Sequence, residues 1–303
     1  MKILCSQVFY PISIGRYLIE ALQERQDVEL KTVGPAWGNQ IPWNGGMNVL
    51  QKYAFNPDIP LPKNINNIPM SFVESRLGDW KPDVVLQVDA GFHMIGRPVH
   101  GYNVQVLSDP HCLMGFYDQV RPYFDLVWNM QTPYMKPDHE YLMYAYSDKW
   151  FYPEETPKVY DACLIGLHYH QRDRLVKALR DQGLNVYYDI GPAFDEYRQI
   201  YNQSKVAISW SSLLDTPMRV YEAMGMQIPL VANRTPDLMN QFKEGLDFRG
   251  FDTLEEAVQT VMFFVNNQAD ADRIARNGFL TAKFEYTWKE RVGEMIDQLM
   301  RRI

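Results

Sequence analysis

The sequence has few cysteines, no long apolar run and no block of basic residues, and each shortage excludes a class of protein. Three cysteines in 303 residues are too few and too scattered for a disulfide framework or a zinc cluster. No run of about 18 apolar residues occurs, and the N-terminus turns polar too soon for a signal peptide. We therefore predict a cytoplasmic protein without a membrane span. The 30 basic residues are outnumbered by 37 acidic ones and form no cluster, which disfavours non-specific binding to phosphate backbones.

The composition is otherwise that of a globular protein, with 46% hydrophobic and 22% charged residues. At roughly 150 residues per domain, the length indicates two domains. The stretch PEETP at 153–157 is typical of a linker. We therefore predict an N-terminal domain over 1–152, a second domain over 158–286 and a terminal segment over 287–303.

Short apolar runs alternate with helical patterns, which is typical of α/β folds with parallel sheets. In the N-terminal half we expect strands at 3–9, 28–33, 83–88, 104–107, 126–128 and 142–146, and helices at 14–24 and 71–80. In the C-terminal half we expect strands at 160–165, 185–188, 206–209 and 228–231, and helices at 171–182, 194–202, 216–225, 253–265, 269–279 and 287–303. Capping boxes at Thr253 with Glu256 and at Thr287 with Glu290 mark two helix starts.

The segment from Thr216 to Glu222 is the most informative part of the sequence. Thr216 before Pro217 is typical of a helix start, with a hydroxyl N-cap and a proline at the first helical position. Arg219 then falls in the first turn, where the helix dipole disfavours a cation by about 0.3–1 kcal/mol, and a bound anion would offset that cost. Glu222 lies on the same face, where a carboxylate suits the two hydroxyls of a ribose. The alternative is a surface network of Asp215, Arg219 and Glu222.

A second candidate corner follows the predicted strand 160–165. Gly166 ends that strand, and the next helix begins with His168, His170 and Arg172. A glycine at the carboxyl end of a strand, before a helix start rich in His and Arg, suits a phosphate group. Because parallel strands end at one edge of a sheet, this corner and Arg219 could meet on one pyrophosphate. The two histidines could also bind a metal, but no third ligand has suitable spacing, so we assign no metal.

These segments are part of a longer pattern of six runs in fixed order. The runs are YDACLIG (160–166), GLNVYY (183–188), IYNQSKVAISW (200–210), DTPMRVYEAMGMQIPLVAN (215–233), EGLDF (244–248) and IARNGFLTAKFEYTWKER (274–291). Residues 158–295 thereby resemble the nucleotide-sugar-binding half of GT-B glycosyltransferases, in particular the CgeB-like group of the spore-maturation type. Phage DNA β-glucosyltransferases are similar in layout and share the Arg-Val-aromatic-Glu run found here at 219–222.

The resemblance implies a GT-B fold, with two Rossmann-like domains facing each other across a cleft and the helix at 287–303 crossing back to the first domain. It implies that Arg219 holds the diphosphate of a nucleotide sugar and Glu222 its ribose. The other residues that it assigns to the donor are Gly166, His168, His170, Arg172 and Thr216. The expected co-substrate is a UDP-sugar, with no further cofactor. Leu214 stands where the large retaining family has an acidic residue, so the stereochemical outcome is left open.

The N-terminal half offers candidates for activating an acceptor. The predicted strand 104–107 is followed by Asp109 and His111, two titratable side chains at a carboxyl end. A direct transfer needs a base that takes the proton of the acceptor hydroxyl. By analogy with the phage enzymes we assign Asp109, with His111 as second choice or as its partner. The alternative is that Asp109 caps the next turn, and Asp89 is a weaker candidate.

A few further residues could contact a ligand. Gly91, beside Asp89, could leave room for one. Trp37 and Trp43 lie in a glycine-flanked loop and could stack on a sugar or on a flipped base. Such tryptophans more often anchor a loop to its own domain, so we draw nothing about the acceptor from them.

Three functions stay open at this point. The first, which we favour, is a glycosyltransferase that acts on a glycan, a protein or a small molecule. The second is a phage-type glycosyltransferase that acts on modified bases in DNA, against which the acidic charge weighs. The third is a non-catalytic module that binds a nucleotide sugar.

Overall fold

The computed structural model describes residues 1–42 and 46–303. The chain folds into two compact units. Unit 1 comprises Met1–Met143 and Val292–Ile303, and unit 2 comprises Tyr144–Arg291. Trp43, one of the two tryptophans considered above, lies outside the described residues.

Unit 1 is built on a parallel sheet with the strand order β11-β10-β9-β7-β1-β2-β5. Its strands are β1 (Lys2–Ser6), β2 (Glu29–Pro35), β5 (Ile59–Leu61), β7 (Val84–Val88), β9 (Tyr102–Leu107), β10 (Leu126–Asn129) and β11 (Glu140–Tyr141). All five residues of the central strand β7 are buried, as expected when helices cover both faces of a parallel sheet. Two small pairs accompany it, β3 (Gln40–Ile41) with β4 (Met47–Asn48) and β6 (Asn67–Pro69) with β8 (His93–Ile95).

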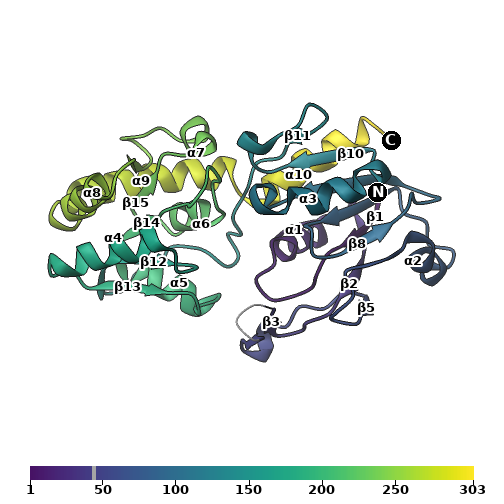
Figure 1. Cartoon of the computed structure of the whole chain (residues 1–303), viewed down its shortest axis with the longest axis horizontal. Helices are drawn as coiled ribbons and strands as arrows, with labels where there is room; N and C mark the ends of the chain where they lie inside the picture. Colours follow the sequence, from purple (N-terminus) through teal and green to yellow (C-terminus); the bar gives the residue numbers. More distant parts are fainter. Residues whose placement is uncertain (43–45) are drawn as a thin grey trace. The chain divides into compact units, whose positions relative to one another are not determined.

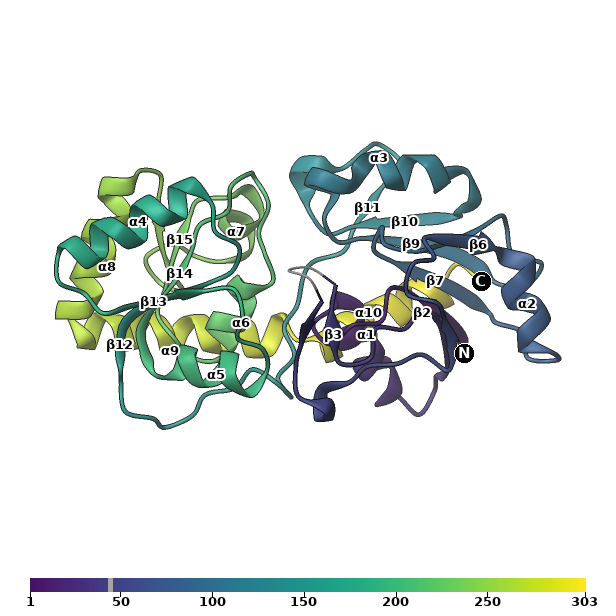
Figure 2. The same cartoon turned by 60° about the horizontal axis from the view of Figure 1, so that its bottom comes forward.

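The helices of unit 1 lie on both faces of this sheet. They are α1 (Ile14–Gln23), α2 (Met70–Leu77), α3 (Pro110–Val120) and the later part of α10 (Trp288–Met300). Figure 2 shows α3 on one face and α1 and α10 on the other. These layers bury the apolar side chains of the strands, among them Leu4, Val33 and Val85.

Unit 2 is a second parallel sheet, in the order β13-β12-β14-β15-β16. Its strands are β12 (Tyr160–Ile165), β13 (Val186–Asp189), β14 (Ser204–Ser209), β15 (Leu230–Asn233) and β16 (Arg249–Phe251). Its helices are α4 (His170–Asp181), α5 (Asp195–Asn202), α6 (Arg219–Gly225), α7 (Pro236–Gln241), α8 (Leu254–Asn266) and α9 (Gln268–Glu285). In Figures 1 and 2, α4 and α8 cover one face, and α5, α6 and α9 the other.

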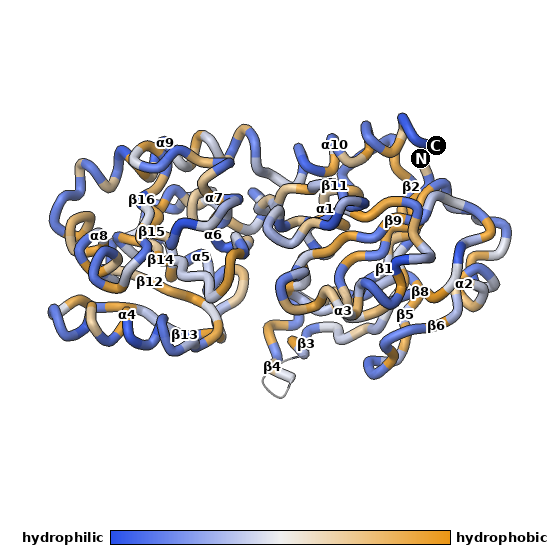
Figure 3. The backbone as a smooth tube through the Cα atoms, turned by 45° about the horizontal axis from the view of Figure 1, so that its top comes forward, coloured by the Kyte–Doolittle hydropathy of each residue, from blue (hydrophilic) through white to orange (hydrophobic). Residues whose placement is uncertain are grey.

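One part of the core of unit 2 lies between the sheet and the helices α4 and α8. Leu164 of β12, Leu175 of α4 and Val261 of α8 are fully buried in one cluster. In Figure 3 the strand β12 is largely hydrophobic, while α4 is mostly hydrophilic. This contrast reflects one amphipathic helix lying on a strand that is buried on both faces.

The predicted α/β fold with two Rossmann-like units is confirmed, but several local predictions are wrong. The helix α3 was not expected, because several of its apolar residues, such as Phe116, stay accessible and blur the one-sided pattern. No strand forms over 142–146 in the described chain; Leu142, Tyr144, Ala145 and Tyr146 are all buried, so their alternation does not mark one face of a sheet. Only the hydroxyl arm of each predicted capping box is seen in the described chain: Thr253 accepts from the Glu256 amide at 3.1 Å and Thr287 from that of Glu290 at 3.3 Å. The Glu256 carboxylate accepts from the Asp252 amide at 2.8 Å and not from that of Thr253.

Candidate active site

The strands of unit 2 all end at the same edge of its sheet, and this edge carries the predicted donor residues. Gly166 follows β12, and Arg219 begins α6 beyond β14. Gly166 has a φ of +150° and donates its N–H to the carbonyl of Asp189 at 3.0 Å. A Cβ placed on Gly166 would come within 2.9–3.1 Å of the Arg219 guanidinium. The fold therefore brings the two predicted corners into direct contact, and the absence of a side chain at 166 is what makes room for the guanidinium.

The Arg219 guanidinium forms no ion pair in the described chain. Its Nη1 is buried and has no hydrogen-bond partner among the described residues. A buried, unpaired donor costs on the order of 1–3 kcal/mol, and more when it is charged. A second guanidinium lies close enough to act on it, since the charge of Arg219 helps to lower the pKa of Arg172. Two neighbouring cations and an unpaired donor form an arrangement that an anion would stabilise.

Arg172 donates hydrogen bonds to the backbone, and its role at the pyrophosphate stays a prediction. It is 3% exposed, and its Nε and Nη1 donate to the carbonyls of Trp210 at 2.7 Å and Leu167 at 2.8 Å. Its pKa falls to about 10, first because of burial and then because of Arg219. Arg172 thus ties together the loops that follow β12 and β14, and it adds positive charge behind Arg219.

Thr216 does not cap the helix, contrary to the sequence prediction. The helix α6 begins at Arg219, with Met218 at the N-cap position and no side-chain cap in the described chain. Thr216 is 1% exposed, and its hydroxyl shares a hydrogen bond of 2.5 Å with that of Thr235, which follows β15. The Thr216 hydroxyl is therefore bonded to a residue outside this helix. At the start of α6, the Val220 amide donates to the Pro217 carbonyl at 3.0 Å.

Glu222 is buried one turn along α6 from Arg219. It is 5% exposed, and its Oε2 accepts a hydrogen bond of 2.6 Å from the hydroxyl of Tyr197 in α5. Burial raises the pKa of Glu222 to about 7, while the Tyr197 hydrogen bond and the charge of Arg219 oppose that rise. Tyr197 was missed from the sequence. The only signal for it is its spacing of four residues from Tyr201, whose ring lies 4.6 Å away.

The two predicted histidines have other partners or none in the described chain. The His168 ring stacks on Tyr188 of the edge strand β13 at 4.2 Å and 17°, and it lines a groove of about 460 Å³ with Asp173 and Arg180. His170 is the exposed first residue of α4. Within the described chain neither forms a hydrogen bond or an ion pair with Arg219 or Glu222, so their role at the donor stays a prediction. Among the described residues no group of three or more His, Cys, Asp or Glu side chains could hold a metal.

The corresponding edge of unit 1 carries carboxylates. Asp89 follows β7 and has a φ of +68°, which is strained for a residue other than glycine. Its Oδ1 accepts from the Tyr117 hydroxyl at 3.1 Å and from the Ala90 amide at 2.6 Å. Burial raises the pKa of Tyr10 and Tyr117 well above the usual value, and the charges of Asp89 and Asp109 add to that rise in both tyrosines. The two carboxylates therefore lie around the same pair of phenols.

Asp109 occupies the N-cap position of α3, but its side chain makes no cap hydrogen bond in the described chain. The alternative that Asp109 serves as a helix cap is thus wrong. The His111 ring lies 6.0 Å from that of Tyr134, and its Nδ1 is buried without a partner among the described residues. A Cβ on Gly91 would meet Val8 at 2.7 Å, so the space at this glycine is filled by protein.

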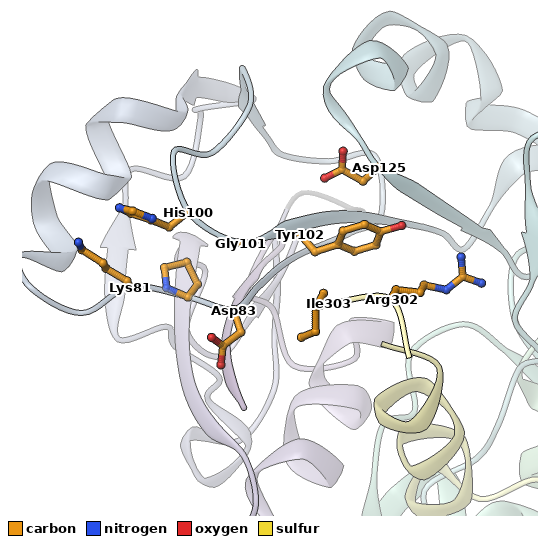
Figure 4. A pocket seen from close by; sticks show the side chains of 9 residues that line it. Lys81, Asp83, His100, Gly101, Tyr102, Asp125, Arg302 and Ile303 are labelled. Carbon is orange, nitrogen blue, oxygen red and sulfur yellow. The ribbon is translucent and has the colours of Figure 1, made fainter. Parts of the chain in front are cut away.

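A pocket of about 630 Å³ lies at the opposite edge of the unit 1 sheet, where β7 and β9 begin. Figure 4 shows Lys81, His100, Tyr102 and Arg302 around it. Arg302 is paired with Glu140 at 2.7 and 2.8 Å. Ligands of parallel α/β sheets bind at the carboxyl ends of the strands, so we give this pocket no part in the reaction.

Comparison with known proteins identifies the fold. Residues 172–297 match the sequence family described as Glycosyl transferase-like. The chain is similar to sucrose-phosphate synthase from Thermosynechococcus elongatus, with 12% identity, 100% of this chain and 98% of the other covered, and a TM-score of 0.65. It is also similar to a glycosyltransferase from Rickettsia africae, with 10% identity, 99% of this chain and 98% of the other covered, and a TM-score of 0.65. HepE from Anabaena, in complex with UDP-glucose, has 12% identity, with 98% of this chain and 100% of the other covered and a TM-score of 0.62.

The chain has the GT-B glycosyltransferase fold. The predicted enzyme class, glycosyltransferase, is confirmed by the matched family together with this fold. No curated protein matches the chain in sequence, and the finer resemblance to CgeB-like and phage enzymes stays a prediction. No helix in the described part of the GT-B chain is long and apolar enough to cross a membrane.

Proposed function

We propose that this GT-B protein transfers a sugar from a nucleoside diphosphate sugar, with UDP as the nucleotide, to a hydroxyl of the acceptor. The observation that carries the proposal is the Arg219 guanidinium, which lies against Gly166 with an unpaired buried donor and a second guanidinium behind it. A diphosphate supplies the negative charge that this arrangement lacks. UDP is chosen because HepE, a protein of the same fold, was crystallised with UDP-glucose.

Each step of the reaction falls to a named side chain. Arg219 binds the diphosphate, and Arg172 adds positive charge, so the leaving nucleoside diphosphate is stabilised as the glycosidic bond breaks. Glu222 accepts hydrogen bonds from the ribose hydroxyls through the carboxylate oxygen that Tyr197 does not occupy. Asp109 takes the proton of the acceptor hydroxyl as that oxygen attacks the anomeric carbon. No metal is given a role, and unchanged transfer in EDTA tests that part of the proposal.

The experiment combines ligand binding with turnover. Thermal unfolding is measured with UDP, GDP, ADP, CDP and dTDP and with their sugar conjugates; a ligand at about 100 times its Kd adds roughly 2.7 kcal/mol of stability. Conjugates that bind are then incubated with glycans, small hydroxylated molecules and DNA containing hydroxymethylated bases, and nucleotide release is followed. Selective binding of UDP compounds with release that depends on an acceptor supports the proposal. Binding without release would indicate a non-catalytic module, and binding of none would contradict the donor site.

A further inference from the structure

The two carboxylate oxygens of Glu222 have different surroundings. Oε2 accepts the hydroxyl of Tyr197 at 2.6 Å, whereas Oε1 accepts no hydrogen bond from the described residues. Glu222 is nevertheless 5% exposed and forms no ion pair in the described chain. A buried carboxylate with one oxygen fixed and the other unsatisfied is suited to accept a donor group from a ligand.

Tyr197 is itself held in place by aromatic neighbours. Its ring lies 4.6 Å from that of Tyr201 and 5.5 Å from that of Phe151. The phenol is thus fixed from α5 and from the segment before β12, so its hydroxyl reaches Glu222 from one direction.

We propose that Tyr197 is a positioning residue of the donor site, which holds Glu222 so that Oε1 accepts the ribose hydroxyls and which favours the ionised carboxylate that they require. This inference rests on the proposed function. Because the phenol donates a hydrogen bond to the carboxylate, it stabilises the ionised form of Glu222 more than the neutral form. Binding of the donor should therefore be accompanied by loss of a proton from Glu222.

The titratable and charged groups that face Glu222 affect its pKa. They are Tyr197 and Tyr201 on α5 and Arg219 on α6. Burial places the pKa of Glu222 at about 7, and the Tyr197 hydrogen bond is the first factor that opposes this rise. Removing the phenolic hydroxyl should move the pKa of Glu222 further upward, and with it the pH at which donor affinity is half lost.

The test is the affinity of the full chain for UDP-glucose between pH 5.5 and 8.5, measured by titration calorimetry. UDP-glucose is preferred to UDP because a terminal phosphate titrates near pH 6. For the wild type, affinity should fall toward tenfold per pH unit below about pH 7 and level off above it. Tyr197→Phe should move the midpoint upward by about one pH unit, which is a tenfold change in proton affinity. Tyr286→Phe is the matched control, since it removes a buried tyrosine hydroxyl that donates to the Gln241 carbonyl in the same unit; its midpoint should equal the wild-type value.

The outcomes separate this inference from the proposed function. If Tyr197→Phe weakens binding equally at every pH, the hydroxyl has only a structural role and the inference is wrong, while the donor site stands. If UDP-glucose does not bind the wild type at any pH, the proposed function and the inference both fail. Should Tyr197→Phe not fold, proton release by the wild type at pH 6.5, measured in two buffers of different ionisation heat, decides. Release that Glu222→Gln abolishes supports the inference, and binding without release overturns it.

Discussion

The two units share one architecture but present opposite chemistry at the carboxyl ends of their strands. Unit 2 gathers two guanidiniums, Arg219 and Arg172, beside the buried Glu222. Unit 1 gathers the carboxylates Asp89 and Asp109 around two buried phenols. Under the proposed function, the same kind of parallel sheet binds an anionic group in one unit and takes up a proton in the other. The difference teaches that function in this fold depends on which side chains follow each strand.

The largest expected effect is that of Asp109, the proposed base in unit 1. If unit 1 supplies the base, Asp109→Asn should lower kcat by about 10²- to 10⁴-fold and leave the Kd for UDP within twofold of the wild-type value. Initial rates and calorimetric titration with UDP measure the two effects. An equal loss of UDP affinity and of kcat would show that Asp109 has only a structural role. An unchanged kcat would show that Asp109 is not the base and would leave Asp89 and His111 as candidates.

Arg219 tests the other side of the comparison. Arg219→Ala removes the charge at the leaving diphosphate, so we expect a loss of about 10²- to 10³-fold in kcat and weaker binding of UDP. Arg273→Ala is the matched control, because Arg273 is an exposed arginine of unit 2 that pairs with Asp270 at 3.2 Å. A rate within twofold of the wild-type value for Arg219→Ala would contradict the account.

A substitution at Gly166 tests the anion site of unit 2 without removing any charge from it. Gly166→Ala puts a Cβ within 2.9–3.1 Å of the Arg219 guanidinium at a φ of +150°. The guanidinium must shift, so UDP should bind about tenfold more weakly, which corresponds to about 1.4 kcal/mol.

Gly183→Ala is the control for strain alone. Gly183 has a φ of +85° with no atom within 4 Å of its Cβ position. This variant should lower the melting temperature through backbone strain on the order of 1–3 kcal/mol and leave UDP binding unchanged. Equal UDP affinity in both glycine variants would exclude a direct role for the contact between Gly166 and Arg219.

Glu222 gives an effect of a different kind, on the stability of the protein without ligand. Its carboxyl ionises near 4.5 when unfolded and at about 7 when folded. The unfolded state therefore loses its proton first, and folding stability should decline as the pH rises from about 4.5 to about 7, by up to about 3 kcal/mol. Glu222→Gln should remove this decline, so it should melt above the wild type at pH 8 and close to it at pH 4.5. A variant that melts lower at pH 8 would contradict the assigned cause.

The sequence allowed much of the fold and part of the site to be predicted, for identifiable reasons. Gly166 and Arg219 were predictable because a glycine after a strand and a cation in a first helical turn each break a local preference. Thr216 was misjudged because its partner, Thr235, comes from the next strand. Tyr197 was missed because it precedes Glu222 by many residues and meets it only through the packing of α5 against α6. A sequence pattern shows where a residue is unfavourable in its own helix or strand. It does not show which residues of distant elements come into contact when the chain folds.

A crystal structure with UDP would show whether the carboxyl edge of unit 2 binds the diphosphate of a nucleotide sugar. We expect phosphate oxygens within hydrogen-bond distance of the Arg219 guanidinium, next to Gly166, and ribose hydroxyls on Oε1 of Glu222. UDP bound elsewhere on the chain, or an Arg219 guanidinium that makes no contact with phosphate, would contradict this expectation.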